Sequence, residues 1–359
     1  MPKKPSLQKP KAKPISLVIG AYGAGNFGDD LLFLAAANIE AKAGFEPICC
    51  GYFPPKVKQK FKFLDIADAA SHVKALPHGS KVVLGGGGLL WSEESAARFS
   101  ALIALAKMRG LKTAVHGIGL QGPGATLSAS LYLMHECADE FSVRDDASLA
   151  ILRGVMGADH KAVMLGDLVA REESAFLFER ARKRKSHKTP VKIGFNLSWA
   201  RFSQDAGFRH HVCLSLTNAA LQLKGRAELH YVPQVMHRMS MDEQCVIFGE
   251  WLRVASAGAI KTNAPPDVAE DFVLMVAKHD VILAGRLHTA ICAKMSGMPF
   301  AILNQSNTDT ADKYHCIADA HSRSKINFDR HNWEVTDDIV STANSLIVEL
   351  EAGKVTSSR

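Results

Sequence analysis

The sequence predicts an α/β chain with two doubly wound parallel sheets that face a cleft. Short apolar runs alternate with helical segments in both halves of the chain, so each half predicts repeated β-α-β units. A polar and strongly basic stretch, 171–190, separates the halves and predicts a linker. Glycine-dense loops follow several of the apolar runs, at the strand ends where ligands of parallel sheets bind.

The chain has 359 residues, enough for two domains of ordinary size. We expect five parts: a basic tail, an N-terminal domain, a basic linker, a C-terminal domain, and a C-terminal helix with a tail. Their ranges are 1–14, 15–170, 171–190, 191–330 and 331–359.

Composition narrows the class of protein. Seven cysteines without a CxxC pair indicate neither a disulfide framework nor a zinc site, and fit the reducing cytoplasm. The tail lacks the apolar core of a signal peptide, and no apolar run reaches the length of a membrane-spanning helix. The net charge of +7 favours anionic partners. Part of it lies in the tail and in Arg180–Lys185; such runs are usually solvated, but they suit nucleic acid or an acidic lipid surface.

The first half opens with a predicted strand, Ile15–Ile19, a glycine-rich loop, a helix over Leu31–Ala43 and a strand over Phe45–Tyr52. The loop matches the Gly-x-Gly-x-x-Gly pattern of dinucleotide sites, with Gly28 as its last glycine. The second strand, however, ends without the acid that would hold a ribose. We therefore interpret the loop as a cradle for a phosphate or sugar, and Asp30 as a helix cap at least as readily as a ligand.

The next predicted strand, Lys81–Leu84, runs into four consecutive glycines, Gly85–Gly88. Such a run is costly in chain entropy, and it indicates a close approach of backbone to a ligand. Further along, Arg144 and Asp145 follow a strand that begins at Phe141, and they could form a structural ion pair. The remaining expected elements of this half are a helix over 96–109, a strand over 113–116, a helix over 147–153 and a short strand at 163–165.

The second half is organised around residues 280–299. Val281–Ala284 is a continuous apolar run, Gly285 permits a tight turn, and a short helix follows. Arg286 and His288 then lie where a strand ends and a helix begins, which suits an anionic substrate and acid–base chemistry. The alternative is that Arg286 pairs with a structural carboxylate and His288 caps the helix. The other elements expected here are strands over 191–195, 229–232 and 299–303 and helices over 213–223, 242–255, 267–278 and 336–351.

With these residues in hand, the chain resembles the polysaccharide pyruvyl transferase family from about Leu17 to Lys313. The matching pieces are the Asn26-Phe-Gly28-Asp29 loop, Gly85–Gly88, Ser142–Ser148, Asp167, and Ala284–Ala290. The chain departs from the family where Leu168 follows Asp167, and where the loop before Lys313 lacks a tyrosine; both departures concern the acceptor side.

The resemblance implies two Rossmann-like domains arranged as in the GT-B glycosyltransferases, with the acceptor on the N-terminal side and the donor on the C-terminal side. It implies transfer of the enolpyruvyl unit of phosphoenolpyruvate to a sugar of a cell-surface polysaccharide or its precursor, lipid-linked or free, as a pyruvate ketal. His288 and Arg286 are the expected catalytic residues, with His237 a weaker second. The expected substrate-binding residues are Asn26, Gly28, Asp29, Gly86, Gly87, Arg144, His237 and Lys313.

No cofactor and no metal are expected, since phosphoenolpyruvate is itself the donor. We expect a cytoplasmic enzyme with peripheral contact to an acidic membrane surface, and no nucleic acid partner. Two alternatives stay open: a GT-B glycosyltransferase that uses a nucleotide-sugar, and a non-catalytic binder of anions or nucleic acid. The sequence argues against the binder because its basic runs are not interleaved with aromatic residues. An NAD oxidoreductase is disfavoured because the ribose-binding acid is missing.

Overall fold

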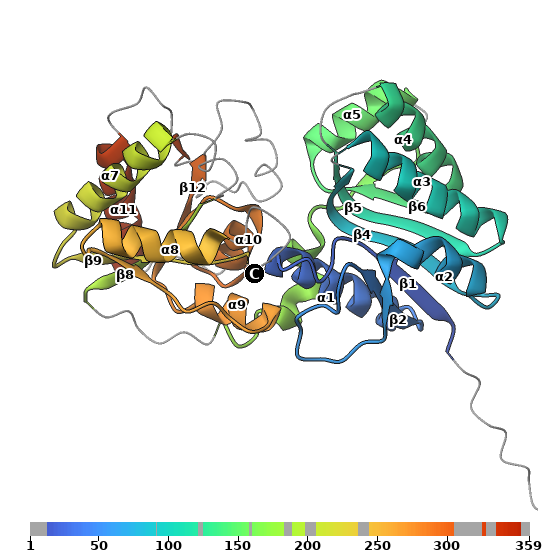
Figure 1. Cartoon of the computed structure of the whole chain (residues 1–359), viewed down its shortest axis with the longest axis horizontal. Coiled ribbons are helices and arrows are strands. Elements are labelled where there is room, and N and C mark those ends of the chain that lie inside the picture. Colours follow the sequence, from blue (N-terminus) through green and yellow to red (C-terminus); the bar gives the residue numbers. More distant parts are fainter. Residues whose placement is uncertain are drawn as a thin grey trace, which may run out of the picture.

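The computed structural model shows two α/β lobes joined end to end, with helices α1, α9 and α10 where the lobes meet (Figure 1). It describes residues 13–90, 92–120, 125–157, 160–182, 189–197, 206–235, 244–304, 325–327 and 335–352.

The N-terminal domain is built on a seven-stranded parallel sheet in the order β3-β2-β1-β4-β5-β6-β7. Its strands are β1 Ile15–Ile19, β2 Glu46–Gly51, β3 Phe63–Asp65, β4 Lys81–Leu90, β5 Lys112–Leu120, β6 Glu140–Val143 and β7 Val163–Met164. Its helices are α1 Phe27–Lys42, η1 Ile66–Asp68, α2 Ala69–Ala75, α3 Glu93–Met108, α4 Ala125–Cys137, α5 Asp146–Met156, η2 Leu168–Ala170 and η3 Glu172–Leu177, of which the three labelled η are 3-10 helices.

The C-terminal domain repeats the plan with a six-stranded parallel sheet in the order β10-β9-β8-β11-β12-β13. Its strands are β8 Val191–Asn196, β9 Ala227–Tyr231, β10 Ile260–Thr262, β11 Val281–Ala284, β12 Phe300–Asn304 and β13 Lys325–Asn327. Its helices are α7 Ala206–Gln222, α8 Gln244–Ala255, α9 Ala269–Val276, α10 Leu287–Met295 and α11 Val335–Glu351. The predicted α/β class with two parallel sheets is thus confirmed.

Two elements differ from expectation at the places that matter for function. Helix α1 begins at Phe27, four residues before the expected Leu31, because the Asn26 side chain caps it by accepting from Gly28 N. The expected strand 81–84 continues through the four glycines to Leu90, so they form part of β4. The elements without a counterpart in the prediction are α2, α4, the short strands β3, β10 and β13, and the three 3-10 helices.

One apolar core is shared between the domains. It contains much of α1 together with buried residues of α9 and α10, and Phe27 of α1 stacks on Phe272 of α9 at 5.9 Å between ring centroids. Each sheet has a second apolar core on its other face, and each of these cores contains residues of one domain only. Helix α1 therefore belongs to the packing of both halves.

The segment that follows the first sheet packs on the same helix. Within the predicted linker, η3 lies against α1, where Asn38 Nδ2 donates to the carbonyl of Glu173 at 2.8 Å, and Phe178 is fully buried. Residues 183–188 lie outside the described ranges. None of the described helices is both long enough and apolar enough to cross a membrane.

Candidate functional site

Two helix N-termini meet where the domains join. Helix α1 follows β1 of the first sheet, and α10 follows β11 of the second. His288, the second residue of α10, is buried against Gly28 in the first turn of α1. A Cβ atom on Gly28 would come within 2.2 Å of His288 Nδ1, so position 28 admits only glycine while the imidazole stays in place.

The other edge of the imidazole faces a carboxylate of the N-terminal domain. His288 Nε2 lies 3.5 Å from Asp167 Oδ2, and Asp167 is completely buried. Its second oxygen accepts from Val169 N at 3.0 Å and so caps η2. Burial on its own would raise the pKa of Asp167, but the neighbouring His288 and Arg144 hold that pKa below its usual value.

A second carboxyl lies on the α1 side of the same histidine. Asp29 is half-buried, and its Oδ2 accepts from Asn26 Nδ2 at 3.0 Å. Burial raises the pKa of Asp29 to about 6, although His288, the Asn26 hydrogen bond and Arg286 all act to lower it. Two carboxyls near one imidazole thus titrate in different ranges, an arrangement typical of acid–base sites.

Cations complete the group. Arg286 occupies the N-cap position of α10 with extended backbone and makes no side-chain cap hydrogen bond, and it is close enough to Asp29 to lower that pKa. His288 lies inside the helix, two residues after this N-cap, so the alternative that His288 caps the helix is wrong.

Arg144 enters from the end of β6. Its Nε donates to Asp145 Oδ2 at 3.0 Å, which confirms the expected ion pair, and its guanidinium is buried against Gly119. A Cβ on Gly119 would come within 2.4 Å of Arg144 Nη2. The charge of Arg144 also lowers the pKa of Asp167, which lies beside His288. The Arg144–Asp145 ion pair therefore acts electrostatically on the His288 site.

Asn26 is the centre of a polar chain between the domains. Its Oδ1 accepts from Gly28 N at 3.1 Å and from Gln234 Nε2 at 3.0 Å. Gln234 Oε1 in turn accepts from Thr289 Oγ1 at 2.8 Å, and Asn196 Nδ2 donates to the same hydroxyl. The first turns of α1 and α10 are thereby linked through one glutamine.

The glycines of β4 border this group. Gly86 and Gly87 have φ angles of 73° and 83°, which favour glycine. A Cβ on Gly86 would meet Leu32 Cδ2 at 2.7 Å, and one on Gly87 would lie 3.8 Å from Asp29 Oδ1. The two glycine-rich segments are neighbours, as expected for strands that pair side by side, and contacts with α1 already require glycine at position 86.

Asp30 is not the helix cap, contrary to expectation; Asn26 has that role. The fully buried Asp30 carboxylate accepts from Gly23 N at 2.8 Å and from Lys56 N at 3.1 Å. Burial raises the pKa of Asp30 to about 7 in spite of these hydrogen bonds. Asp30 therefore holds two loops against the start of α1.

The structure brings together Asn26, Gly28, Asp29, Gly87, Arg286 and His288, with Arg144 joined to them through Asp167. His237 and Lys313 lie outside the described residues.

Sequence reasoning matched Asp167 to the family but did not assign it to the site, and it missed Gln234 and Thr289. Asp167 could have been found as an acid at a strand end, whereas Gln234 carries no such signal. In the described part of the chain, no group of His, Cys, Asp and Glu is arranged to hold a metal.

Comparison with known proteins gives one family and one fold. The family model described as polysaccharide pyruvyl transferase matches residues 26–307. A search of curated proteins gives no match.

Solved structures with a similar fold include a putative UDP-N-acetylglucosamine 2-epimerase from Listeria monocytogenes, at 13% identity and a TM-score of 0.61 over 97% of this chain and 91% of that one. The UDP-GlcNAc 2-epimerase of Methanocaldococcus jannaschii in complex with UDP-GlcNAc and UDP is 10% identical, with a TM-score of 0.61 over 93% and 92%. A glycosyltransferase from Rickettsia africae is 11% identical, with a TM-score of 0.56 over 94% and 89%. At these identities the likeness concerns the GT-B arrangement of two domains alone.

Proposed function

Because this chain belongs to the polysaccharide pyruvyl transferase family, we propose that it transfers the enolpyruvyl unit of phosphoenolpyruvate to a sugar of a cell-surface polysaccharide or its precursor, as a pyruvate ketal. The observation that carries the proposal is the group of His288, Asp167, Asp29 and Arg286 where the two domains meet. Phosphoenolpyruvate and the sugar acceptor are the only reactants, and the reaction as proposed needs no cofactor.

The donor is a compact dianion or trianion, so its site needs fixed positive charge. Arg286 presents a planar guanidinium at the start of α10, where backbone N–H groups and the helix dipole also favour anions. In the proposal Arg286 binds the carboxylate or the phosphate of the donor. Arg144, paired with Asp145, serves as a second positive charge behind Asp167.

The proton movements set the roles of the acids and the histidine. Protonation of the methylene carbon makes it a methyl group and activates C2, to which one sugar hydroxyl adds. Phosphate then leaves with its bridging oxygen, and the second hydroxyl closes the ketal. Of the two hydroxyl protons, one balances the proton given to carbon and the other leaves with phosphate. His288 is the proposed proton carrier, and Asp167 orients and stabilises its charged form.

Asp29 is the proposed partner for the acceptor. Its pKa of about 6 lets it accept a proton from a sugar hydroxyl near neutral pH and release it again. Asn26 contributes indirectly, because its amide is committed to Gly28, Asp29 and Gln234. The acceptor would then lie beside α1 and β4, with the donor beside α10.

The test is a paired assay of donors with candidate acceptor sugars. Phosphate release from phosphoenolpyruvate and nucleotide release from nucleotide-sugars are measured on the same preparation. In D₂O the proposed reaction places one solvent deuterium in the ketal methyl group, a product that mass spectrometry identifies. Acceptor-dependent nucleotide release without phosphate release would replace the proposal by a nucleotide-sugar transferase.

That second candidate has one observation in its favour, since the similar structures include an epimerase that binds UDP-GlcNAc. The likeness is of fold only. The family match concerns the sequence itself, and it is the reason we place pyruvyl transfer first.

A further inference from the structure

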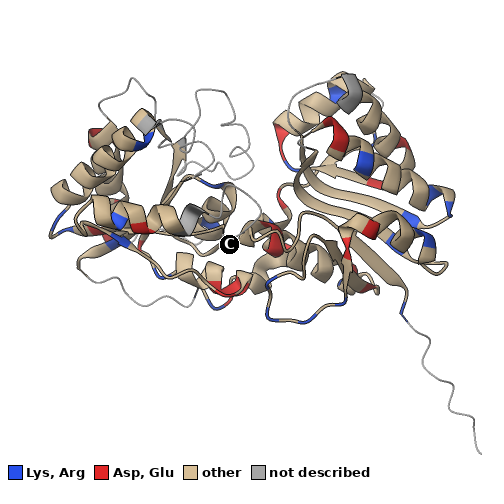
Figure 2. Cartoon of the chain, viewed as in Figure 1, with Lys and Arg blue, Asp and Glu red and all other residues tan. Residues whose placement is uncertain are grey.

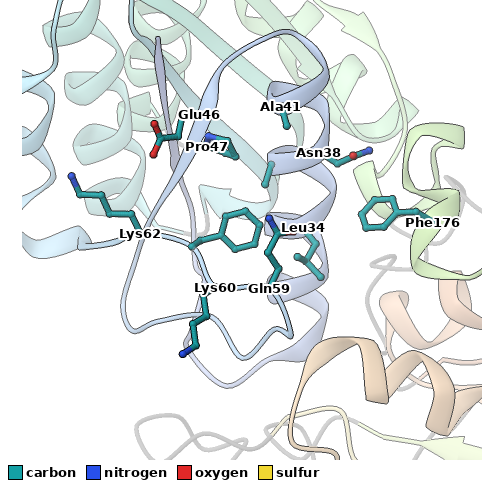
Figure 3. Close-up of a pocket in the computed structure, with 11 residues that line it drawn as sticks. Leu34, Asn38, Ala41, Glu46, Pro47, Gln59, Lys60, Lys62 and Phe176 are labelled. Carbon is teal, nitrogen blue, oxygen red and sulfur yellow. The ribbon is translucent and has the colours of Figure 1, made fainter. Parts of the chain in front are cut away.

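A separate pocket of about 290 Å³ lies on the outer face of α1, and none of the acid–base group lines it (Figure 3). Its floor is one stripe of the helix at spacings of three and four residues: Leu34, Ala37, Asn38 and Ala41. Its walls come from Pro47 of β2, from Phe61 in the loop before β3, and from Phe176 of η3. The described lining is therefore apolar except for Asn38 and for groups at the rim.

The walls are held in place by contacts within the protein. Phe61 packs edge-on against Phe33 of α1 at 4.8 Å between ring centroids. The opposite wall is tied to α1 by the hydrogen bond from Asn38 to the carbonyl of Glu173. Phe176 itself keeps 42% of its surface exposed, an unusual position for a large aromatic side chain. The pocket is thus built into the fold and open to solvent.

The rim is basic. The segment between β2 and β3 carries a lysine at every second position from Lys56 to Lys62. Lys58 pairs with Asp271 at 2.6 Å, whereas Lys60 and Lys62 are exposed at the pocket and point away from its floor (Figure 3). Glu46 is the acid among the lining residues. Figure 2 shows the lysines of this segment as a run of blue along the loop beneath α1.

Two further basic segments adjoin this region in the sequence. The backbone carbonyl of Pro14 accepts from Glu46 N at 2.8 Å, so the chain enters the fold at the rim. The preceding residues include five lysines, Lys3, Lys4, Lys9, Lys11 and Lys13. The run Arg180–Lys185 starts four residues after Phe176. Both basic runs of the sequence are therefore connected along the chain to segments that border this pocket.

We propose that the pocket binds an acyl chain of an anionic lipid, with the headgroup phosphate between Lys60 and Lys62, so that this face of the N-terminal domain docks on an anionic membrane. An apolar floor with a basic rim matches the two ends of such a molecule. A soluble anion would leave the apolar walls without a function. The inference does not depend on the reaction proposed above.

The first experiment uses the full chain and vesicles of equal parts phosphatidylglycerol and phosphatidylcholine, with pure phosphatidylcholine as the reference. Sedimentation should show binding to the anionic vesicles only. The double variant Lys60→Glu/Lys62→Glu should weaken that binding roughly 30-fold or more, because each lysine at an anionic surface is worth about 1 kcal/mol. The control Lys74→Glu/Lys224→Glu removes the same charge from exposed positions elsewhere and should bind much as the parent chain.

The second experiment separates the pocket from the charges. Dihexanoyl phosphatidylglycerol, added as monomers, should raise the melting temperature, whereas inorganic phosphate should not. Ala41→Trp, at an exposed position of the floor, fills the pocket and should abolish that rise while keeping the parent fold by circular dichroism. The proposal is overturned if Ala41→Trp still responds to the short-chain lipid. It is equally overturned if removal of residues 1–12 abolishes vesicle binding while the Lys60→Glu/Lys62→Glu variant binds normally.

Discussion

The N-termini of α1 and α10 differ in how they are capped and in the charge of their first residues. Helix α1 is capped by an Asn26 side chain and carries acids in its first turn, the arrangement that the helix dipole favours. Helix α10 lacks a side-chain cap hydrogen bond and begins with Arg286, whose positive charge the dipole disfavours, followed by Leu287 and His288. The start of α1 makes room for the start of α10, since the absence of a side chain at Gly28 admits the imidazole of His288 and Asp29 lies beside it. Arg286 and His288, which depart from the usual preferences of a helix start, are the residues to which the proposed function assigns donor binding and proton transfer.

The variant with the largest expected effect on this comparison is His288→Asn. Asparagine keeps hydrogen-bonding capacity but cannot titrate, so we expect turnover to fall by roughly 10²–10⁴-fold with the fold intact. Phosphate release from phosphoenolpyruvate and a melting curve are the two measurements. His78→Asn, at an exposed loop position, is the matched control and should keep full activity. Normal turnover of His288→Asn would make α10 a structural helix and leave the proton donor to be found elsewhere.

Arg286→Lys tests the other of these two residues at the start of α10. Lysine keeps the charge but loses the planar fork, so the KM for phosphoenolpyruvate should rise roughly 10–100-fold, corresponding to about 1.5–3 kcal/mol for hydrogen bonds to a charged group. Donor titration by initial rates measures it, and the melting temperature serves as the control for folding. An unchanged KM would remove Arg286 from donor binding.

Gly28→Ala tests whether the start of α1 really accommodates the histidine. The new Cβ would overlap the imidazole, so the two helix starts must separate or His288 must rotate, at a cost of about 1–3 kcal/mol. We expect a lower free energy of unfolding by denaturant, together with reduced turnover. The control is Ala43→Gly, which changes the C-terminal end of α1 away from the site. Gly44→Ala is less suitable, because the positive φ of Gly44 would add backbone strain of its own. Full stability and activity of Gly28→Ala would show that the contact is not needed.

The smallest effect concerns the two acids beside His288. The pKa of Asp29 is raised from 3.8 to about 6, so its contribution to stability is present below pH 4 and is lost as the pH rises through 6. Asparagine does not titrate, so Asp29→Asn lacks this pH-dependent loss. The free energy of unfolding of the variant, relative to that of the parent, should rise by about 1–2 kcal/mol from pH 4 to pH 7. Denaturant unfolding across this range measures the change.

Asp167 provides the matched comparison, because its pKa is shifted downward. Its stabilising contribution is present above the unfolded pKa and is lost as the pH falls. Asp167→Asn should therefore lose stability relative to the parent toward neutral pH, the opposite sign to Asp29→Asn. Equal signs for the two variants would contradict the opposed environments described above.

The pattern of apolar residues within single segments was sufficient to predict the fold class and the positions of Arg286 and His288 at the start of α10. Val281–Ala284 was recognisable as a buried parallel strand because it is a continuous apolar run, and Ile15–Ile19 because it is apolar except for Ser16. The positions of Arg286 and His288 followed directly from the strand before them. The start of α1 was misplaced because Phe27 and Gly28 resemble loop residues, and their place in the helix depends on the Asn26 cap.

The partners across the domain boundary could not be predicted in this way. Asp167 meets His288, and Gln234 meets Asn26, only when the two domains have docked. No periodicity within a segment encodes that docking. Similarly, the glycines of β4 predicted a close approach of the backbone to a ligand, and the group that approaches Gly86 in the structure is Leu32 of α1.

The sharing of α1 has a consequence for how the molecule comes apart. Phe27 stacks on Phe272 while the same helix covers the first sheet, so melting either half strips apolar contacts from the other. The two lobes should consequently unfold in one cooperative transition, with equal calorimetric and van't Hoff enthalpies. Two separate heat-absorption peaks would mean that the shared helix couples them only weakly. Under the cooperative behaviour, neither lobe expressed alone would retain its inner face, and the exposed side of α1 would make the isolated N-terminal half prone to aggregation.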